Sequence, residues 1–229
     1  MAIVWGLWLD DRKFFAMALD RDKTAVDGIG SNIGHCLWTG IVDDHKAPYV
    51  ARTLVGSTMF SGWGIRTLST DMSGFNPIGY HSGSVWPHDT AVCAAGLARY
   101  GFVDEASTVL TGMFDAATFD DGRLPELFSG LDRSELSSPV SFPASCSPQA
   151  WSAGAALLAL RTLLGFNPDL PNGRLYIAGK AANGIQHLRI ERLMLGGRAI
   201  SIELHDGEVR IDGLDSSVQV VRVPNGVEK

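Results

Sequence analysis

The spacing of apolar residues changes once along the chain, and this change limits the folds open to it. Up to Leu164 the longer apolar segments repeat at helical intervals, whereas from Gly173 apolar and polar residues alternate as in strands. The turn-forming run Pro171-Asn172-Gly173 separates the two patterns. We therefore predict a mainly helical domain over residues 1–171 and a small domain of strands over residues 172–229.

The helical part is predicted to consist of hairpins. Helical spacing occurs at residues 34–42, 48–55, 88–100, 105–119 and 147–164. Because short connections join the first two segments and the next two, each pair is expected to form an antiparallel αα-hairpin. The last segment is almost entirely apolar and is predicted to be buried. Ahead of these helices, residues 7–30 alternate weakly and predict two short strands around a polar turn.

The last part of the chain is predicted to be a small antiparallel sheet. Alternation occurs at residues 175–177, 188–190, 199–204, 209–211 and 218–223. The run from His205 to Glu208 contains Asp206-Gly207, which is typical of a tight hairpin turn.

Composition and charge exclude several classes of function. The 229 residues are 45% hydrophobic, enough for one or two cores. The net charge of −6 and the scattered Lys and Arg residues leave no basic stripe, so neither nucleic acid nor an anionic membrane is expected as a partner. Neutral polar ligands suit this composition better.

The cysteines and the N-terminal segment give no sign of a secreted or membrane protein. Cys36, Cys93 and Cys146 are odd in number and lack Cys-x-x-Cys spacing, so we interpret them as reduced packing thiols. The apolar start is short and has no basic leader, which favours neither a signal peptide nor a membrane span. A cytoplasmic location is therefore expected.

The segment Tyr80–Asp89 is the richest in groups that bind ligands. It places two aromatic residues, His81, His88 and a carboxylate directly before a helix of small residues. A loop with this composition at the start of a helix suits a small polar ligand. A metal set of His81, His88 and Asp89 is the less favoured interpretation, because their spacing matches no zinc motif. No metal or other cofactor is predicted.

Four motifs occur in one order along the chain: Phe60-Ser-Gly-Trp-Gly-Ile-Arg-Thr-Leu, then Asn76-Pro77 followed by Tyr80-His-Ser-Gly-Ser-Val-Trp-Pro-His-Asp, then Arg123-Leu-Pro-Glu-Leu-Phe-Ser-Gly, and last Pro143-x-x-Cys-Ser-Pro-Gln-Ala-Trp-Ser-Ala-Gly. Together they resemble the C-terminal part of bacterial glycogen debranching enzymes, or amylo-α-1,6-glucosidases. These belong to the six-hairpin glycosidases, which include mannosylglycerate hydrolase. The resemblance covers roughly residues 7–205.

The resemblance implies part of an (α/α)6 toroid of helical hairpins, a carbohydrate substrate and inverting hydrolysis by two carboxyl groups. It points to Glu126 as the general base. The residues expected to bind the sugar are Trp63, Arg66, Tyr80, His81, Trp86, His88, Asp89 and Gln149. A carboxylate between apolar residues can activate water when a second carboxyl group lies roughly 6.5–9.5 Å away.

Each of these residues also has a purely structural interpretation. Trp86 can be a core aromatic, and the Tyr80 hydroxyl can bond only backbone. His88 and Asp89 lie in a first helical turn, where the helix dipole favours a carboxylate regardless of function. Arg66 can pair with Asp71, and Gln149 can contact only the backbone at the start of its helix.

The family's general acid is an aspartate in an Arg-Asp pair, and this chain has no convincing counterpart. Asp20-Arg21-Asp22 falls in a predicted polar turn. We therefore expect the chain to be the C-terminal part of a longer glycoside hydrolase, completed by an N-terminal half or a second chain. The alternative is a non-catalytic carbohydrate-binding or vestigial half-domain.

Overall fold

A computed structural model describes residues 6–178, 187–205 and 208–223 of the chain. The chain divides into two compact units, Met1–Leu158 and Ala159–Lys229. The division falls within the last helix, upstream of the turn-rich junction in the sequence. The division into a glycosidase-like domain over residues 1–171 and a tail domain over residues 172–229 stays a prediction.

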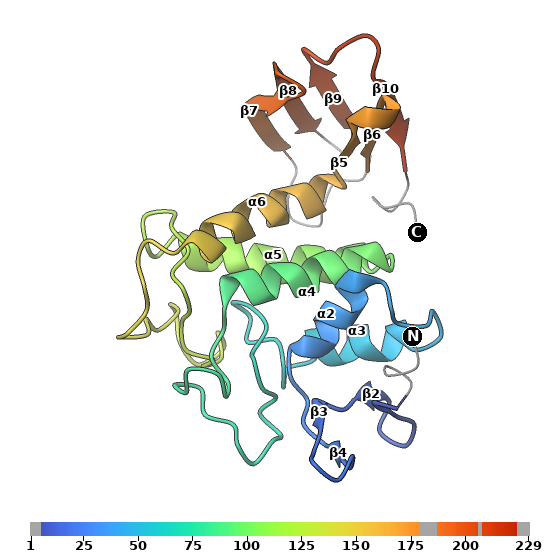
Figure 1. Cartoon of the computed structure of the whole chain (residues 1–229). Helices are drawn as coiled ribbons and strands as arrows, with labels where there is room; N and C mark the ends of the chain where they lie inside the picture. The colour runs from blue at the N-terminus through green and yellow to red at the C-terminus, as the bar shows by residue number, and fades with distance from the viewer. Residues whose placement is uncertain (1–5, 179–186, 206–207, 224–229) are drawn as a thin grey trace. The chain divides into compact units, whose positions relative to one another are not determined.

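The helices of the described residues occupy the segments predicted for them (Figure 1). They are α2 (Asn32–Thr39), α3 (Ala47–Val55), α4 (Pro87–Arg99), α5 (Val103–Ala117) and α6 (Ala150–Leu164). Pro87 starts α4 at a position where the missing backbone N–H costs nothing. Helices α4 and α5 lie side by side, joined by residues 100–102, which confirms the predicted hairpin.

Helix α2 packs closely against α4 because glycines face each other across the contact. A Cβ atom built on Gly96 would lie 2.6 Å from the carbonyl oxygen of Gly34. The small residues Ala91 and Ala94 of α4 are fully buried, as expected for a helix enclosed by neighbours. This packing fixes the start of α4, which carries the end of the Tyr80–Asp89 segment.

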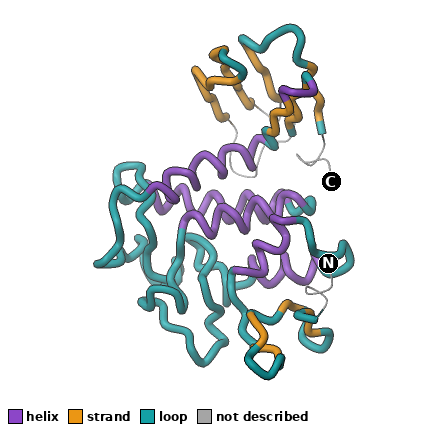
Figure 2. The backbone as a smooth tube through the Cα atoms, viewed as in Figure 1, coloured by secondary structure: helices purple, strands orange, loops and turns teal. Residues whose placement is uncertain are grey.

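Two long loops make up much of the first unit (Figure 2). Residues 56–86 connect α3 to α4, and residues 118–149 connect α5 to α6. An isolated antiparallel bridge between Val85 and Phe128 joins the two loops, and a second bridge pairs Val85 with Arg66 within the first loop. Val85 and Phe128 are also buried together in a small apolar cluster. The loop that carries Tyr80 is thereby held beside the loop that carries Glu126.

The first unit also contains two small β-hairpins ahead of α2. Strands β1 (Trp8–Leu9) and β2 (Phe14–Phe15) pair antiparallel, as do β3 (Ala18–Leu19) and β4 (Ala25–Val26). The sequence predicted two strands around one turn in this region, whereas the part of it that the structure describes forms four strands. Two-residue strands are too short to show an alternating pattern of their own.

The described residues of the second unit form two three-stranded sheets. Its elements after α6 are β5 (Asn167–Asp169), the short 3-10 helix η1 (Leu170–Asn172), β6 (Arg174–Ile177), β7 (His187–Leu195), β8 (Arg198–His205), β9 (Glu208–Asp212) and β10 (Gln219–Arg222). The strand orders are β10-β6-β5 and β7-β8-β9. Ile200, Ile202 and Leu204 alternate along β8 and enter the core, as their spacing predicted. The predicted turn at Asp206-Gly207 lies outside the described residues, although the flanking His205 and Glu208 pair with each other.

The predicted fold class is wrong. Instead of a mainly helical part of a toroid with an antiparallel tail, the described residues form five α-helices and four small sheets. The helices were predicted correctly, but the short strands before α2 and the extent of the loops were underestimated. The tail is not purely antiparallel, because β10 pairs parallel with β6. An alternating pattern shows which face of a strand is buried but not which strand lies next to it.

The predicted burial of the last helix also fails in part. Trp151 is 67% exposed and Leu157 is 70% exposed on α6.

Among the described residues, no helix has the length and apolar character needed to cross a membrane.

Candidate functional site

Glu126 lies in the loop between α5 and α6, and three donors hold its carboxylate. The Tyr80 hydroxyl donates to Oε1 over 2.8 Å, the Gln149 amide donates to the same oxygen over 3.3 Å, and the Cys146 backbone N–H donates to Oε2 over 2.9 Å. Only 7% of the residue is exposed. One donor comes from the loop before α4 and two come from residues 146–149, and together they restrict rotation of the side chain.

These hydrogen bonds favour the ionised carboxylate. The backbone N–H of Cys146 and the hydroxyl of Tyr80 lower the pKa of Glu126 below its ordinary value. In turn, the hydrogen bond to Glu126 raises the pKa of Tyr80, so the phenol keeps its proton. At neutral pH, Glu126 is therefore a proton acceptor.

A row of rings runs beside this carboxylate. Tyr80 meets Trp86 edge-on at 4.8 Å and Phe142 at 5.7 Å between ring centroids. His81 stacks on Trp86, with ring planes 10° apart and centroids at 5.3 Å. The row continues through His88, whose ring centroid lies 5.5 Å from that of Trp86. A hydrogen bond from the Trp86 indole N–H to the carbonyl oxygen of Tyr80 helps to hold these rings in place.

A pocket of about 380 Å³ lies among these groups. Its lining residues are Tyr80, His81, Trp86, His88, Glu126, Gln149 and Trp151. Six of these were predicted as site residues from the sequence. A volume of this order fits a monosaccharide-sized ligand, and the mixture of rings, imidazoles, an amide and a carboxylate suits a polyhydroxylated one.

Burial also changes the protonation of His88, another residue that lines the pocket. Burial lowers the pKa of His88, so its imidazole is neutral at pH 7. Its Nδ1 atom is buried and has no hydrogen-bond partner among the described residues. A neutral imidazole can both donate to and accept from sugar hydroxyls.

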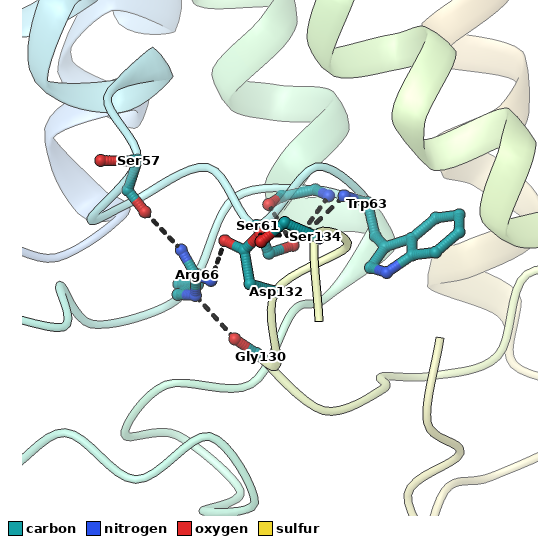
Figure 3. A network of polar contacts seen from close by, with 8 residues as sticks. Ser57, Ser61, Trp63, Arg66, Gly130, Asp132 and Ser134 are labelled. Atoms are coloured by element: carbon teal, nitrogen blue, oxygen red, sulfur yellow. Dashed lines mark hydrogen bonds and ion pairs between the residues drawn. The ribbon is translucent and has the colours of Figure 1, made fainter. Parts of the chain in front are cut away.

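Arg66 was predicted to bind substrate, but the structure gives its guanidinium other partners (Figure 3). Arg66 is 2% exposed and donates to the carbonyl oxygens of Gly130 and Ser57 and to a carboxylate oxygen of Asp132. It pairs with Asp132 rather than with Asp71, the partner considered from the sequence. The guanidinium thus ties the two long loops together.

Trp63 and Asp89, two further predicted site residues, do not line the pocket. Trp63 is buried with Val85, Ala116 and Phe128. The imidazole Nε2 of His35 lies 2.5 Å from an oxygen of Asp89. The structure therefore brings Glu126, Tyr80, His81, Trp86, His88 and Gln149 together, and places Trp63, Arg66 and Asp89 elsewhere.

Sequence reasoning missed Trp151 and Cys146. Trp151 lines the pocket and presents a large exposed ring, with its centroid 5.2 Å from that of His88. The signal for it was its place two residues after Gln149, at the first turn of a helix. Cys146 was interpreted only as a packing thiol, and no sequence signal indicated that its backbone N–H binds Glu126.

Comparison with protein families identifies the group to which the chain belongs. Residues 2–134 match the family described as "Mannosylglycerate hydrolase MGH1-like glycoside hydrolase domain", more than half of the 229 residues. The chain belongs to this family. The MGH1-like match includes Tyr80–Asp89 and Glu126, whereas Gln149 and Trp151 lie beyond it. No curated protein matches the chain.

Solved structures support the likeness at the level of fold. A sialidase aligns with a TM-score of 0.65 and 13% identity over 91% of this chain and 21% of its own. The GH63 mannosylglycerate hydrolase from Thermus thermophilus in complex with glucose aligns with a TM-score of 0.52 and 20% identity, over 68% of this chain and 37% of its own. Neutral trehalase Nth1 from Saccharomyces cerevisiae aligns with a TM-score of 0.53 and 14% identity, over 69% of this chain and 28% of its own. The MGH1-like chain thus spans 21% to 37% of these structures' chains.

Proposed function

We propose that the pocket around Glu126 is part of the active site of an inverting glycoside hydrolase, with Glu126 as the general base. The observation that carries this proposal is the state of Glu126, an ionised carboxylate that three donors hold in a pocket lined by aromatic rings. An ionised carboxylate can take a proton from water as the water attacks a sugar's anomeric carbon. It cannot protonate the leaving group.

The reaction needs a second carboxyl group to act as the general acid. In inverting glycosidases the two groups lie roughly 6.5–9.5 Å apart, with the water between one of them and the sugar. Among the described residues that line the pocket, Glu126 is the one carboxylic acid. We propose that the acid is a carboxyl group from outside the described pocket lining, supplied by an N-terminal half or by a second chain.

We propose an α-glucoside or α-mannoside as the substrate, and a cytoplasmic role in the breakdown of a branched or small glycoside of the debranching type. Trp151 and Tyr80 offer exposed rings for the apolar face of a sugar. His88, His81 and Gln149 supply donors and acceptors for its hydroxyls. Motif resemblance to the debranching enzymes and the MGH1-like family match support this class of substrate.

The test uses substrates that differ in their need for a general acid. Fluoride leaves from α-glucosyl or α-mannosyl fluoride without protonation, whereas an alkyl α-glucoside needs an acid to protonate its leaving oxygen. We expect the chain alone to release fluoride and to leave methyl α-glucoside intact. Glu126→Gln should abolish fluoride release, and proton NMR should show a β-anomer as the first sugar product.

A fluoride-release rate that is equal in Glu126→Gln and in the parent chain would disprove the assignment of the base. Retention of the α-configuration would disprove inversion. The second candidate, a carbohydrate-binding module without catalysis, is favoured by the single carboxylate in the described pocket lining. That candidate predicts saturable glucose binding by NMR with no fluoride release from either fluoride.

A further inference from the structure

A cluster of three metal-binding side chains lies where α2 meets α4, apart from the residues that line the pocket. His35 comes from α2, and Asp89 and Cys93 lie one turn apart on the same face of α4. One donor atom from each residue, a ring nitrogen, a carboxylate oxygen and a sulfur, falls within 4.8 Å of the other two. From the sequence, the metal set that included Asp89 had His81 and His88 as its other members, and neither belongs to this cluster.

The cluster contains an unsatisfied negative group. Asp89 is 8% exposed, and one of its carboxylate oxygens meets His35 at 2.5 Å. The other oxygen is buried and has no hydrogen-bond partner among the described residues. A buried carboxylate with a free oxygen is costly unless a cation or a donor reaches it. The side chain of His35 is 45% exposed, which gives an ion a route from solvent.

This set of donors selects for a particular class of ion. Nitrogen, oxygen and sulfur ligands together suit zinc, with bonds of about 2.0–2.3 Å, whereas calcium and magnesium prefer oxygen alone. We propose that His35, Asp89 and Cys93 bind one zinc ion, with water as the fourth ligand, and that this ion fastens α2 to α4.

Binding exchanges protons for metal bonds. The Cys93 thiol donates to the Ser31 carbonyl oxygen over 3.3 Å in the structure. On coordination its proton leaves to solvent, and a sulfur–zinc bond replaces the S–H bond. The hydrogen on His35 Nε2, which bonds Asp89 in the metal-free chain, also leaves: a doubly protonated ring releases it to solvent and a neutral ring carries it on Nδ1 instead, so that Nε2 supplies its lone pair to zinc. No oxidant or reductant is needed. Because α4 starts directly after Trp86, the ion would hold one wall of the pocket in place.

The experiment replaces zinc with cobalt, whose spectrum reports its ligands. After removal of metal by chelation, Co²⁺ added to the chain should produce a thiolate-to-cobalt charge-transfer band and tetrahedral d–d bands at one equivalent. Zn²⁺ should abolish both and raise Tm. Cys93→Ser should lose the charge-transfer band, and the matched controls Cys36→Ser and Cys146→Ser should keep it.

A second variant guards against misfolding of Cys93→Ser in its tight environment. His35→Gln removes a half-exposed ligand, and calorimetry should show zinc affinity falling by more than the roughly 10- to 100-fold that loss of an outer-shell partner costs. The proposal fails if the parent chain binds no Co²⁺ at one equivalent. It also fails if the charge-transfer band survives Cys93→Ser or disappears in either control. These readouts do not depend on glycoside hydrolysis.

Discussion

Tyr80 is one of the donors that lower the proton affinity of Glu126, and its removal should change the pH dependence of the site. The backbone N–H of Cys146 and the Tyr80 hydroxyl both stabilise the ionised carboxylate and so lower the pKa of Glu126. In Tyr80→Phe the Cys146 bond remains, so the pKa should rise only part of the way to its ordinary value. A general base works when ionised, and the acid limb of the fluoride-release profile should therefore move to higher pH.

The control for this prediction is Tyr49→Phe. It removes a tyrosine hydroxyl from α3, from a residue that does not line the pocket. It should leave the profile in place. If Tyr80→Phe lowers the rate equally at every pH, Tyr80 acts by contacting the sugar and not by tuning Glu126. A shift of the acid limb to lower pH would contradict the assignment of Glu126 as a base.

The site residues that could be predicted from the sequence are those whose neighbours in the site are also close to them in the sequence. Tyr80, His81, Trp86 and His88 lie in one short segment, so their common location could be inferred. Arg66 was misassigned because its partners Gly130 and Asp132 lie in a distant loop that no local pattern connects to it. An arginine with unknown partners looks the same in a sequence whether it binds a ligand or carbonyl oxygens.

The contact between α2 and α4 depends on glycine at two positions, and this can be tested with one added methyl group. A Cβ atom at Gly96 would lie 2.6 Å from the Gly34 carbonyl oxygen and 2.7 Å from the Trp38 backbone nitrogen. Backbone atoms cannot move aside cheaply, so overpacking should outweigh the gain in helix propensity. Gly96→Ala should lower the free energy of unfolding by about 1–3 kcal/mol in urea titrations.

The matched variant is Gly154→Ala on α6, where nothing lies within 4 Å of the added carbon. There, helix propensity acts alone, and the change should raise the stability by up to about 1 kcal/mol. Equal effects of the two substitutions would mean that α2 and α4 are not in close contact.

Helices and strands with long periodic patterns could be predicted. Two-residue strands, and the pairing of strands that lie far apart in the sequence, could not. The helical segments and the alternation at Ile200, Ile202 and Leu204 correspond to α2–α6 and β8. The two-residue strands before α2 and the parallel pairing of β10 with β6 carry no local signal. The fold class was wrong for this reason, although most of its helices and longer strands were right.

At the scale of the whole chain, one apolar cluster lies within the second compact unit, and a core mutation in that cluster is expected to act first on that unit. Ile202 is 1% exposed, pairs with Ile190 and Ile211, and lies in an apolar cluster whose described members all belong to the second unit. Ile202→Ala should destabilise that unit by about 2–5 kcal/mol. All six tryptophans precede Leu158, so tryptophan fluorescence reports only on the first unit.

We therefore expect Ile202→Ala to move part of the far-UV circular dichroism transition to lower urea concentration and to leave the tryptophan fluorescence transition where it is. Val109→Ala on α5, fully buried in the first unit, is the reciprocal control and should shift the fluorescence transition. If Ile202→Ala moves both signals together, the chain unfolds as one cooperative unit. In that case a change in the sheets would also reach Glu126, and fluoride release should fall at the urea concentration where the sheets unfold.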